Sequence, residues 1–200
     1  DLKYHHIHQS DCESDCESEC DSDCQSGCDR ICRERRSLAE SDEDGVVTCE
    51  QLECIVGIDD MYFIEVIDCP NFAEIRECAD LENVTINNCP KFELISDRQY
   101  MHTIEIINCN QPSFSIEIYE VNALILTHCH GVTNIPCLGR LGRLDLHYCP
   151  QIRTIPSIPG LSRLFISHCP NITEIEEQPD LELLSIKYCP QFIQLPKLPY

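Results

Sequence analysis

The sequence contains no tryptophan, only two methionines and seven glycines in 200 residues, and few basic side chains. Lysine and arginine number 14 against 35 aspartates and glutamates, which leaves a formal net charge of −21 at pH 7. A chain this acidic repels phosphate groups, so we expect no nucleic acid as a partner and no attraction to anionic membrane surfaces. The sequence also lacks any apolar run of about 18 residues, so we expect no membrane-spanning helix.

Cysteine, by contrast, is abundant, and the distribution of its 17 residues divides the chain into two parts. In residues 11–44 cysteine alternates with acidic residues, which number 13 against 4 arginines. From Val46 onward, β-branched and aliphatic residues dominate and proline appears. A glycine after an acidic run is typical of a boundary, so Gly45 ends an acidic N-terminal arm (1–45) and a main body (46–200) follows.

The arm carries a cysteine at every fourth position, a spacing that aligns the side chains along one stripe of a helix. We predict this helix from about Asp11 to Leu38, with Gly27 weakening it. Three interpretations stay open: a disordered acidic segment, a stripe of disulfide or cross-linking residues, and a metal–thiolate site helped by nearby histidines. The C-x₃-C spacing differs from the C-x₂-C pattern of zinc sites. The cross-link candidates are Cys12, Cys16, Cys20, Cys24, Cys28 and Cys32.

The main body repeats itself every 20 residues. A cysteine marks each unit, and apolar residues precede it by eight, five and three positions, as Leu161, Leu164 and Ile166 precede Cys169. We predict seven clear units and one degenerate unit on the N-terminal side, with segment 109–115 departing from the pattern. The marker cysteines, which we call the ladder cysteines, are Cys69, Cys89, Cys109, Cys129, Cys149, Cys169 and Cys189.

The pattern LxxLxIxxCPxIxxIPxxP resembles the leucine-rich repeat over roughly residues 46–200. The 20-residue period with proline on the return path is similar to the short repeats of bacterial effector proteins. The phrase LxIxxCPxI is similar to repeats of plant intracellular immune receptors. Cysteine stands where the commonest repeat has asparagine. The resemblance implies a right-handed solenoid with short parallel strands and a return side without helices.

We expect the ladder cysteines to point inward and to pack as small apolar groups whose thiols bond weakly to neighbouring carbonyls. Adjacent strands lie about 4.8 Å apart, whereas the Cβ atoms of a disulfide lie about 3.8 Å apart, so bridges between coils are disfavoured. A straight row of sulfurs also does not converge into a tetrahedral metal site. One coil alone buries too little apolar surface to fold, so the stability must come from stacking.

The outward-facing strand residues would form the concave face that binds a partner. Just before each ladder cysteine lies an edge column, and its last four members alternate between histidine and tyrosine. Two interpretations compete: stacked rings that cover a strand edge, or a binding patch that includes the basic spot on this acidic chain. The candidate binding residues are His128, Tyr148, His168, Tyr188, Arg143, Arg163 and Phe165.

The last repeat, around Leu181–Lys187, has no polar cap, so another chain can extend its strand edge. We therefore predict protein partners, including self-association through this repeat or through the arm. Ladder thiols suit a reducing cytosol, whereas a cysteine-dense arm and a first residue other than methionine suit export. A location outside the cell or on a particle surface is slightly favoured over the cytoplasm.

No catalytic motif occurs: HExxH, GxSxG and glycine-rich phosphate loops are all missing from the sequence. We therefore predict a non-enzymatic protein without a cofactor. The leading hypothesis is a structural or assembly protein, in which the solenoid makes protein contacts and the arm cross-links or docks. The alternatives are a ligand-recognition module of the immune or effector type, and metal–thiolate binding by the arm.

Overall fold

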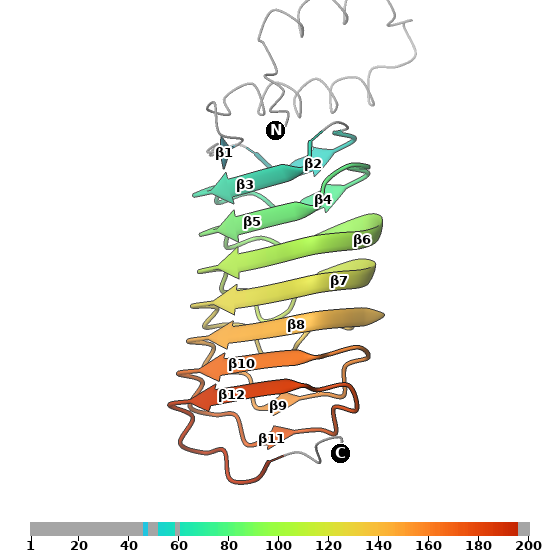
Figure 1. The fold of residues 1–200 in the computed structure, drawn as a ribbon. Coiled ribbons are helices and arrows are strands. Elements are labelled where there is room, and N and C mark those ends of the chain that lie inside the picture. Colours follow the sequence, from blue (N-terminus) through green and yellow to red (C-terminus); the bar gives the residue numbers. More distant parts are fainter. Residues whose placement is uncertain (1–45, 48–51, 59–60, 196–200) are drawn as a thin grey trace, which may run out of the picture.

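The computed structural model describes residues 46–47, 52–58 and 61–195, so the N-terminal arm and its six cysteines lie outside the described residues. The described chain winds into a parallel β-solenoid of about seven turns (Figure 1), as the repeat predicted. No helix occurs within these ranges, which agrees with the expectation of a non-helical return side.

One strand from each turn joins a long parallel sheet that runs the length of the solenoid (Figure 1). Neighbouring strands pair with residues 20 positions apart, as Leu144 pairs with Leu164 and Leu164 with Leu184. Isoleucine, valine and leucine alternate there with polar residues, a pattern that buries one face of a strand. In spatial order the strands are β1 (Val46–Val47), β3 (Phe63–Ile67), β5 (Asn83–Asn87), β6 (Leu94–Ile107), β7 (Ser115–Thr127), β8 (Arg140–His147), β10 (Arg163–Ser167) and β12 (Leu183–Lys187).

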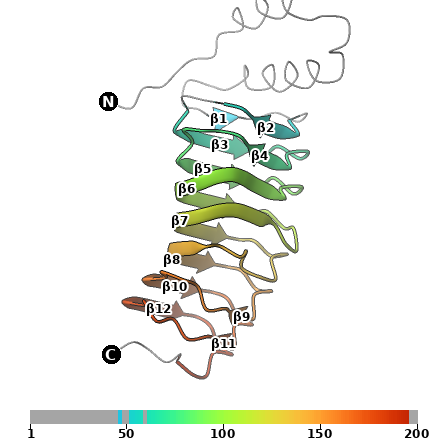
Figure 2. The ribbon, with the colours of Figure 1, turned by 90° about the vertical axis from the view of Figure 1, so that its right-hand side faces the viewer.

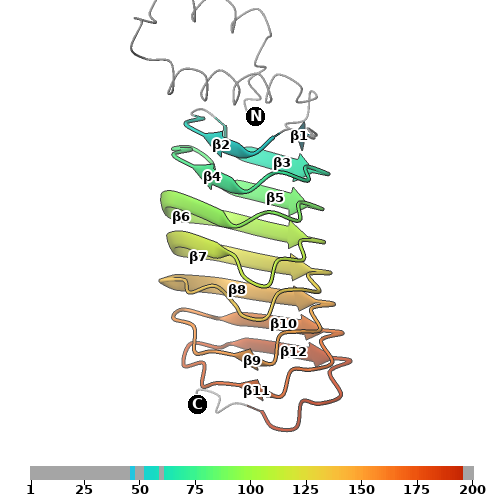
Figure 3. The same cartoon turned by 180° about the vertical axis from the view of Figure 1, so that it is seen from behind.

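Most strands on the return side of the solenoid are short (Figure 3). On the N-terminal half, β2 (Cys54–Val56) pairs with β4 (Glu74–Arg76), which pairs with the first residues of β6. On the C-terminal half, β9 (Thr154–Ile155) pairs with β11 (Glu174–Ile175). Between these pairs, β6 and β7 run without interruption from the return side into the long sheet (Figure 2). Twenty residues per turn leave no room for a helix there.

The irregular segment after Cys109 is a local excursion that leaves the period unchanged. Phe92 follows its ladder cysteine by three positions, whereas Phe114 follows Cys109 by five. The rings of these two phenylalanines nevertheless pack together, with centroids 5.9 Å apart, so Phe114 occupies the regular core place. The register between β6 and β7 then shifts between Ile95 and Arg98, and this shift absorbs the extra residues of the excursion. Cys129 is again 20 residues from Cys109.

The core is a single column of apolar side chains inside the coils. The three positions that precede each ladder cysteine by eight, five and three residues are buried in nearly every turn. Gln178 is a fully buried polar side chain that connects two turns. Its side-chain oxygen accepts from the backbone amide of Ile158 at 3.0 Å, and its side-chain nitrogen donates to the Pro156 carbonyl at 2.7 Å. Because these bonds satisfy the amide, its burial is tolerated.

Candidate functional site

The residue before each ladder cysteine turns the chain out of the long sheet. All seven such residues adopt positive φ angles of 54–55°, and the cysteine that follows then faces the core. The backbone amides of the first six bond to the next turn, as the Tyr148 amide donates to the Ser167 carbonyl at 3.0 Å. The first three are aspartate or asparagine, which tolerate this conformation well. The last four are the histidines and tyrosines of the edge column, which tolerate it less well.

These four rings form a continuous stack, which we call the aromatic row: His128, Tyr148, His168 and Tyr188. Successive ring centroids lie 4.5, 4.3 and 4.5 Å apart, with interplanar angles of 6°, 12° and 26°. Tyr148 is 42% exposed and Tyr188, at the end of the row, 73% exposed. The row thus covers an edge of the sheet and presents the outer side of the Tyr188 ring.

A second cluster lies on the outer face of the long sheet, across β8 and β10. The Arg143 guanidinium donates to both carboxylate oxygens of Asp145, at 2.8 and 2.6 Å, and lies 4.9 Å above the Phe165 ring. These hydrogen bonds raise the pKa of Arg143. The Asp145 side chain is only 6% exposed, because the arginine covers it. Paired geometry of this kind holds the guanidinium and the ring rigid.

The same cluster continues into His147 and Ser167, which are register partners on β8 and β10. His147 Nδ1 lies 2.6 Å from Ser167 Oγ, and its Nε2 lies 4.0 Å from an Asp145 oxygen. A serine and a carboxylate thus flank this imidazole on the sheet face.

Two cations near this cluster have no described partner. Most basic side chains in the described part of the chain engage an acceptor, as Arg76 does with Glu74 and Lys91 with Asn71. Arg163, the register partner of Arg143, and Lys187, the register partner of Ser167, do not. Together with Phe165 they form an exposed basic and aromatic patch, which we call the basic patch: Arg143, Arg163, Phe165 and Lys187.

The ladder cysteines lie inside the corner beneath the aromatic row, and from Cys69 to Cys169 they are at most 2% exposed. Their thiols donate to carbonyls of their own turn and, in the middle of the ladder, of the turn before, as Cys129 does to Thr127 at 3.5 Å and to Ile106 at 3.3 Å. Burial raises the pKa of the Cys109 thiol to about 12. The Cys109 thiol is therefore protonated at neutral pH and packs as a small apolar group.

No disulfide joins the cysteines within the described ranges. Nor do three or more histidine, cysteine or carboxylate side chains gather there as a metal site would require. The described part of the chain contains no helix of the length and hydrophobicity that crossing a membrane requires.

Comparison with known proteins identifies no relative. The chain matches no protein-family model, no curated protein and no solved structure. Its function must therefore be argued from its own residues.

The structure brings the predicted candidate residues together as two neighbouring groups, the aromatic row and the basic patch. Lys187, Asp145, His147 and Ser167 join the second group, and the sequence analysis did not predict them as binding residues. The signal was present: their outward register, at positions four and two before a ladder cysteine, places them side by side on adjacent strands. Their hydrogen bonds depend on side-chain conformation, which the repeat does not encode.

Proposed function

We propose that this protein is a non-enzymatic assembly module that self-associates through its last turn. The observation that carries the proposal is a contrast between two strands of the same pattern. In β10, Leu164 and Ile166 are buried to 0% and 1% exposure, whereas their counterparts in β12, Leu184 and Ile186, are half-exposed. Ile193 and Leu195 are 90% and 61% exposed. An apolar surface of this kind is typical of a protein interface.

The partner that fits this end is a second copy of the chain. The outer edge of β12 pairs with no strand among the described residues, so its backbone groups are available for another strand. Identical chains associate most often about a twofold axis, which would set two β12 edges antiparallel and would cover both apolar ends at once. The basic residues near this end, Lys187 among them, also moderate the repulsion between two acidic chains.

We also propose that the solenoid is of the leucine-rich-repeat kind. The support is the LxxLxIxxCPxI pattern, the 20-residue period and the parallel sheet with one strand per turn. A sharp corner follows each strand. The buried ladder cysteine at this corner stands where the commonest repeat has asparagine.

Self-association can be tested by analytical ultracentrifugation of the full chain over a wide concentration range. We expect a reversible dimer that Ile193→Glu converts to monomer, since it buries a charge in the contact. The matched control is Phe63→Glu, because Phe63 is an exposed apolar residue at the opposite end of the sheet. A monomer at every concentration, or equal effects of both substitutions, would contradict the proposal.

Cross-linking by the arm is a separate part of this function. If Cys12–Cys32 join copies covalently, electrophoresis without reductant should show multimers that reductant removes. Replacing the six arm cysteines by serine should abolish these multimers and leave the noncovalent dimer intact. Multimers that persist in the serine variant would assign the cross-links to other cysteines.

A second candidate function, recognition of an acidic protein partner, is favoured by the two unpartnered cations of the basic patch. Arginine beside an aromatic ring is typical of interface hot spots, and the surrounding negative charge would reject a misplaced acidic ligand. Synthetic polyglutamate is a direct probe, read by fluorescence anisotropy. We expect Arg163→Glu with Lys187→Glu to abolish binding and the control Arg153→Glu, at an exposed arginine outside the sheet face, to have little effect. Equal losses of polyglutamate binding in the double variant and in the control would exclude the basic patch as the binding site.

A further inference from the structure

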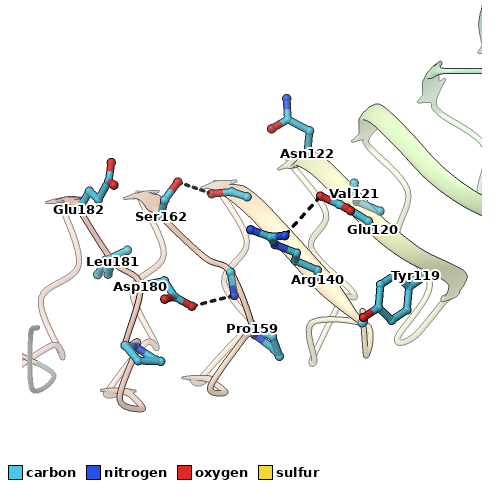
Figure 4. A pocket seen from close by; sticks show the side chains of 14 residues that line it. Tyr119, Glu120, Val121, Asn122, Arg140, Pro159, Ser162, Asp180, Leu181 and Glu182 are labelled. Atoms are coloured by element: carbon cyan, nitrogen blue, oxygen red, sulfur yellow. Dashed lines mark hydrogen bonds and ion pairs between the residues drawn. The ribbon is translucent and has the colours of Figure 1, made fainter.

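A groove lies away from both groups, where the chain enters the strands of four consecutive turns (Figure 4). Its volume is about 730 Å³, within the roughly 300–1,000 Å³ range of small-molecule sites. Equivalent positions from each turn line it: Glu120, Arg140, Gly160 and Asp180 form one row. Since adjacent strands lie about 4.8 Å apart, four turns give the groove a length of about 14 Å.

Glycines let the turns that line this groove contact one another closely. Positions 139, 142 and 160 carry no side chain where the turn before has Tyr119, Asn122 and Arg140. A Cβ atom on Gly139 would lie 2.6 Å from the Tyr119 carbonyl oxygen, and one on Gly160 would lie 2.7 Å from the Arg140 side chain. Glycine at these positions therefore lets Tyr119 and Arg140 lie over the following turn.

The groups that face the groove alternate between donors and acceptors. The Arg140 side chain is 60% exposed and forms a long ion pair with Glu120, at 3.9 Å. Asp180 lies on the other side of Gly160 and accepts from its amide at 3.2 Å. At one end the Tyr119 ring is 66% exposed (Figure 4).

We propose that this groove binds a neutral oligosaccharide. Each sugar hydroxyl both donates and accepts, so one ligand can serve the exposed guanidinium, which is only loosely paired with Glu120, and the flanking carboxylates together. The Tyr119 ring offers a flat apolar surface for the C–H face of a sugar. Glu120, Asp180 and Glu182 repel an anion, and a cationic group cannot accept a hydrogen bond from Arg140 in the middle of the row. An uncharged ligand avoids both penalties and the repulsion of a chain with net charge −21.

The test is titration of the full chain with neutral linear oligosaccharides of glucose, mannose and N-acetylglucosamine, followed by saturation-transfer NMR. At least one series should bind, and longer members should bind more tightly until they fill the four turns. Tyr119→Ala and Arg140→Ala should each weaken binding by roughly tenfold, as loss of a central contact does. Tyr119→Phe, which keeps the ring, should bind as the unchanged protein does.

Two exposed residues outside the groove provide matched controls, Tyr62→Ala and Arg153→Ala, and both should bind normally. Absence of binding to all three series would overturn the proposal. So would binding that survives the double substitution of Tyr119 and Arg140, or a basic peptide that binds in the groove when no oligosaccharide does. These outcomes are separate from those for self-association, because the groove is tested by substitutions at Tyr119 and Arg140 and the dimer by a substitution at Ile193.

Discussion

The residue in front of each ladder cysteine must adopt a left-handed backbone conformation and also cover an edge of the sheet. Aspartate and asparagine fulfil the first requirement in the N-terminal turns, where Asn88 also donates to Asp68 at 2.6 Å. In the C-terminal turns the same position carries large rings, for which this conformation costs about 1–2 kcal/mol per residue. Stacking on both neighbours offsets that cost, since each aromatic pair contributes about 0.5–1.5 kcal/mol.

Removing a ring from the middle of the aromatic row should therefore destabilise the fold. Tyr148→Ala loses two stacked pairs and keeps the backbone strain, so we expect the free energy of unfolding to fall by about 1–3 kcal/mol in urea denaturation. Tyr148→Asn should cost less, because asparagine relieves the strain. Tyr62→Ala, at an exposed tyrosine outside the row, should change stability by no more than about 0.5 kcal/mol. If Tyr148→Ala lowers the free energy of unfolding no more than Tyr62→Ala does, ring stacking does not stabilise the fold.

The buried thiol of Cys109 predicts a loss of stability in alkali. The pKa of Cys109 is about 12 in the folded chain, against 9.0 for the ordinary thiol, because burial disfavours the thiolate. Its contribution is fully present below pH 9, where the unfolded thiol is still protonated, and is lost as the pH rises towards 12.

Comparison with Cys109→Ala isolates this contribution from other titrations. The stability difference between the two proteins should shrink between pH 9 and 12, by an amount on the order of 4 kcal/mol. Urea denaturation at several pH values measures it. A difference that stays constant with pH would mean that Cys109 ionises as readily in the folded chain as in the unfolded one.

At the scale of the element, the irregular turn dictates the sequence of the turn that follows it. The second position after a ladder cysteine is a large polar residue in most turns, such as Lys91 and Gln151, but it is glycine at 131. There the displaced segment after Cys109 brings the Asn110 carbonyl oxygen to within 1.8 Å of where a Cβ atom would lie. Only glycine fits beneath this excursion.

Gly131→Ala should therefore force the two turns apart. We expect a destabilisation of about 1–3 kcal/mol, typical of overpacking, measured by thermal unfolding. The matched control is Gln151→Ala, at the equivalent position of a regular turn, which should be close to neutral. A loss in Gly131→Ala no larger than that in Gln151→Ala would show that the Asn110 carbonyl does not crowd this position.

The repeat predicted the elements that depend on period alone: the parallel pairing, the buried rows and the non-helical return path. The stacked edge column also follows from register, because one column of rings on adjacent strands must lie side by side. The groove does not follow in this way. It depends on how Tyr119 and Arg140 lie over glycines of the following turns, at 139 and 160. The compensation around Phe114 likewise depends on three-dimensional packing that the template does not describe.

For the whole molecule, net charge opposes self-association while the last turn favours it. Two chains of charge −21 repel each other over a distance that shortens from about 30 Å at 0.01 M salt to about 8 Å at 0.15 M. An apolar contact at the last turn is not screened. We therefore expect the dimer to strengthen as salt is added, measured by sedimentation at constant protein concentration.

Binding through the basic patch has the opposite dependence. An acidic ligand held by Arg163 and Lys187 should dissociate as salt is added, because screening weakens its attraction to both cations. Salt thus separates the two proposed contacts on the same protein. A dimer that weakens with salt would place its interface on charged residues and not on the apolar last turn.

The ladder also gives nearly every turn its own chemical reporter. Cys137 is exposed and Cys189 half-exposed, while the thiols from Cys69 to Cys169 are sealed from solvent. A small alkylating reagent should modify the accessible thiols at once and each sealed one only when its turn opens. Because each turn contacts only its neighbours, opening should be easiest at the ends of the array. The order in which the sulfurs acquire label, read by mass spectrometry, would trace how the solenoid unwinds.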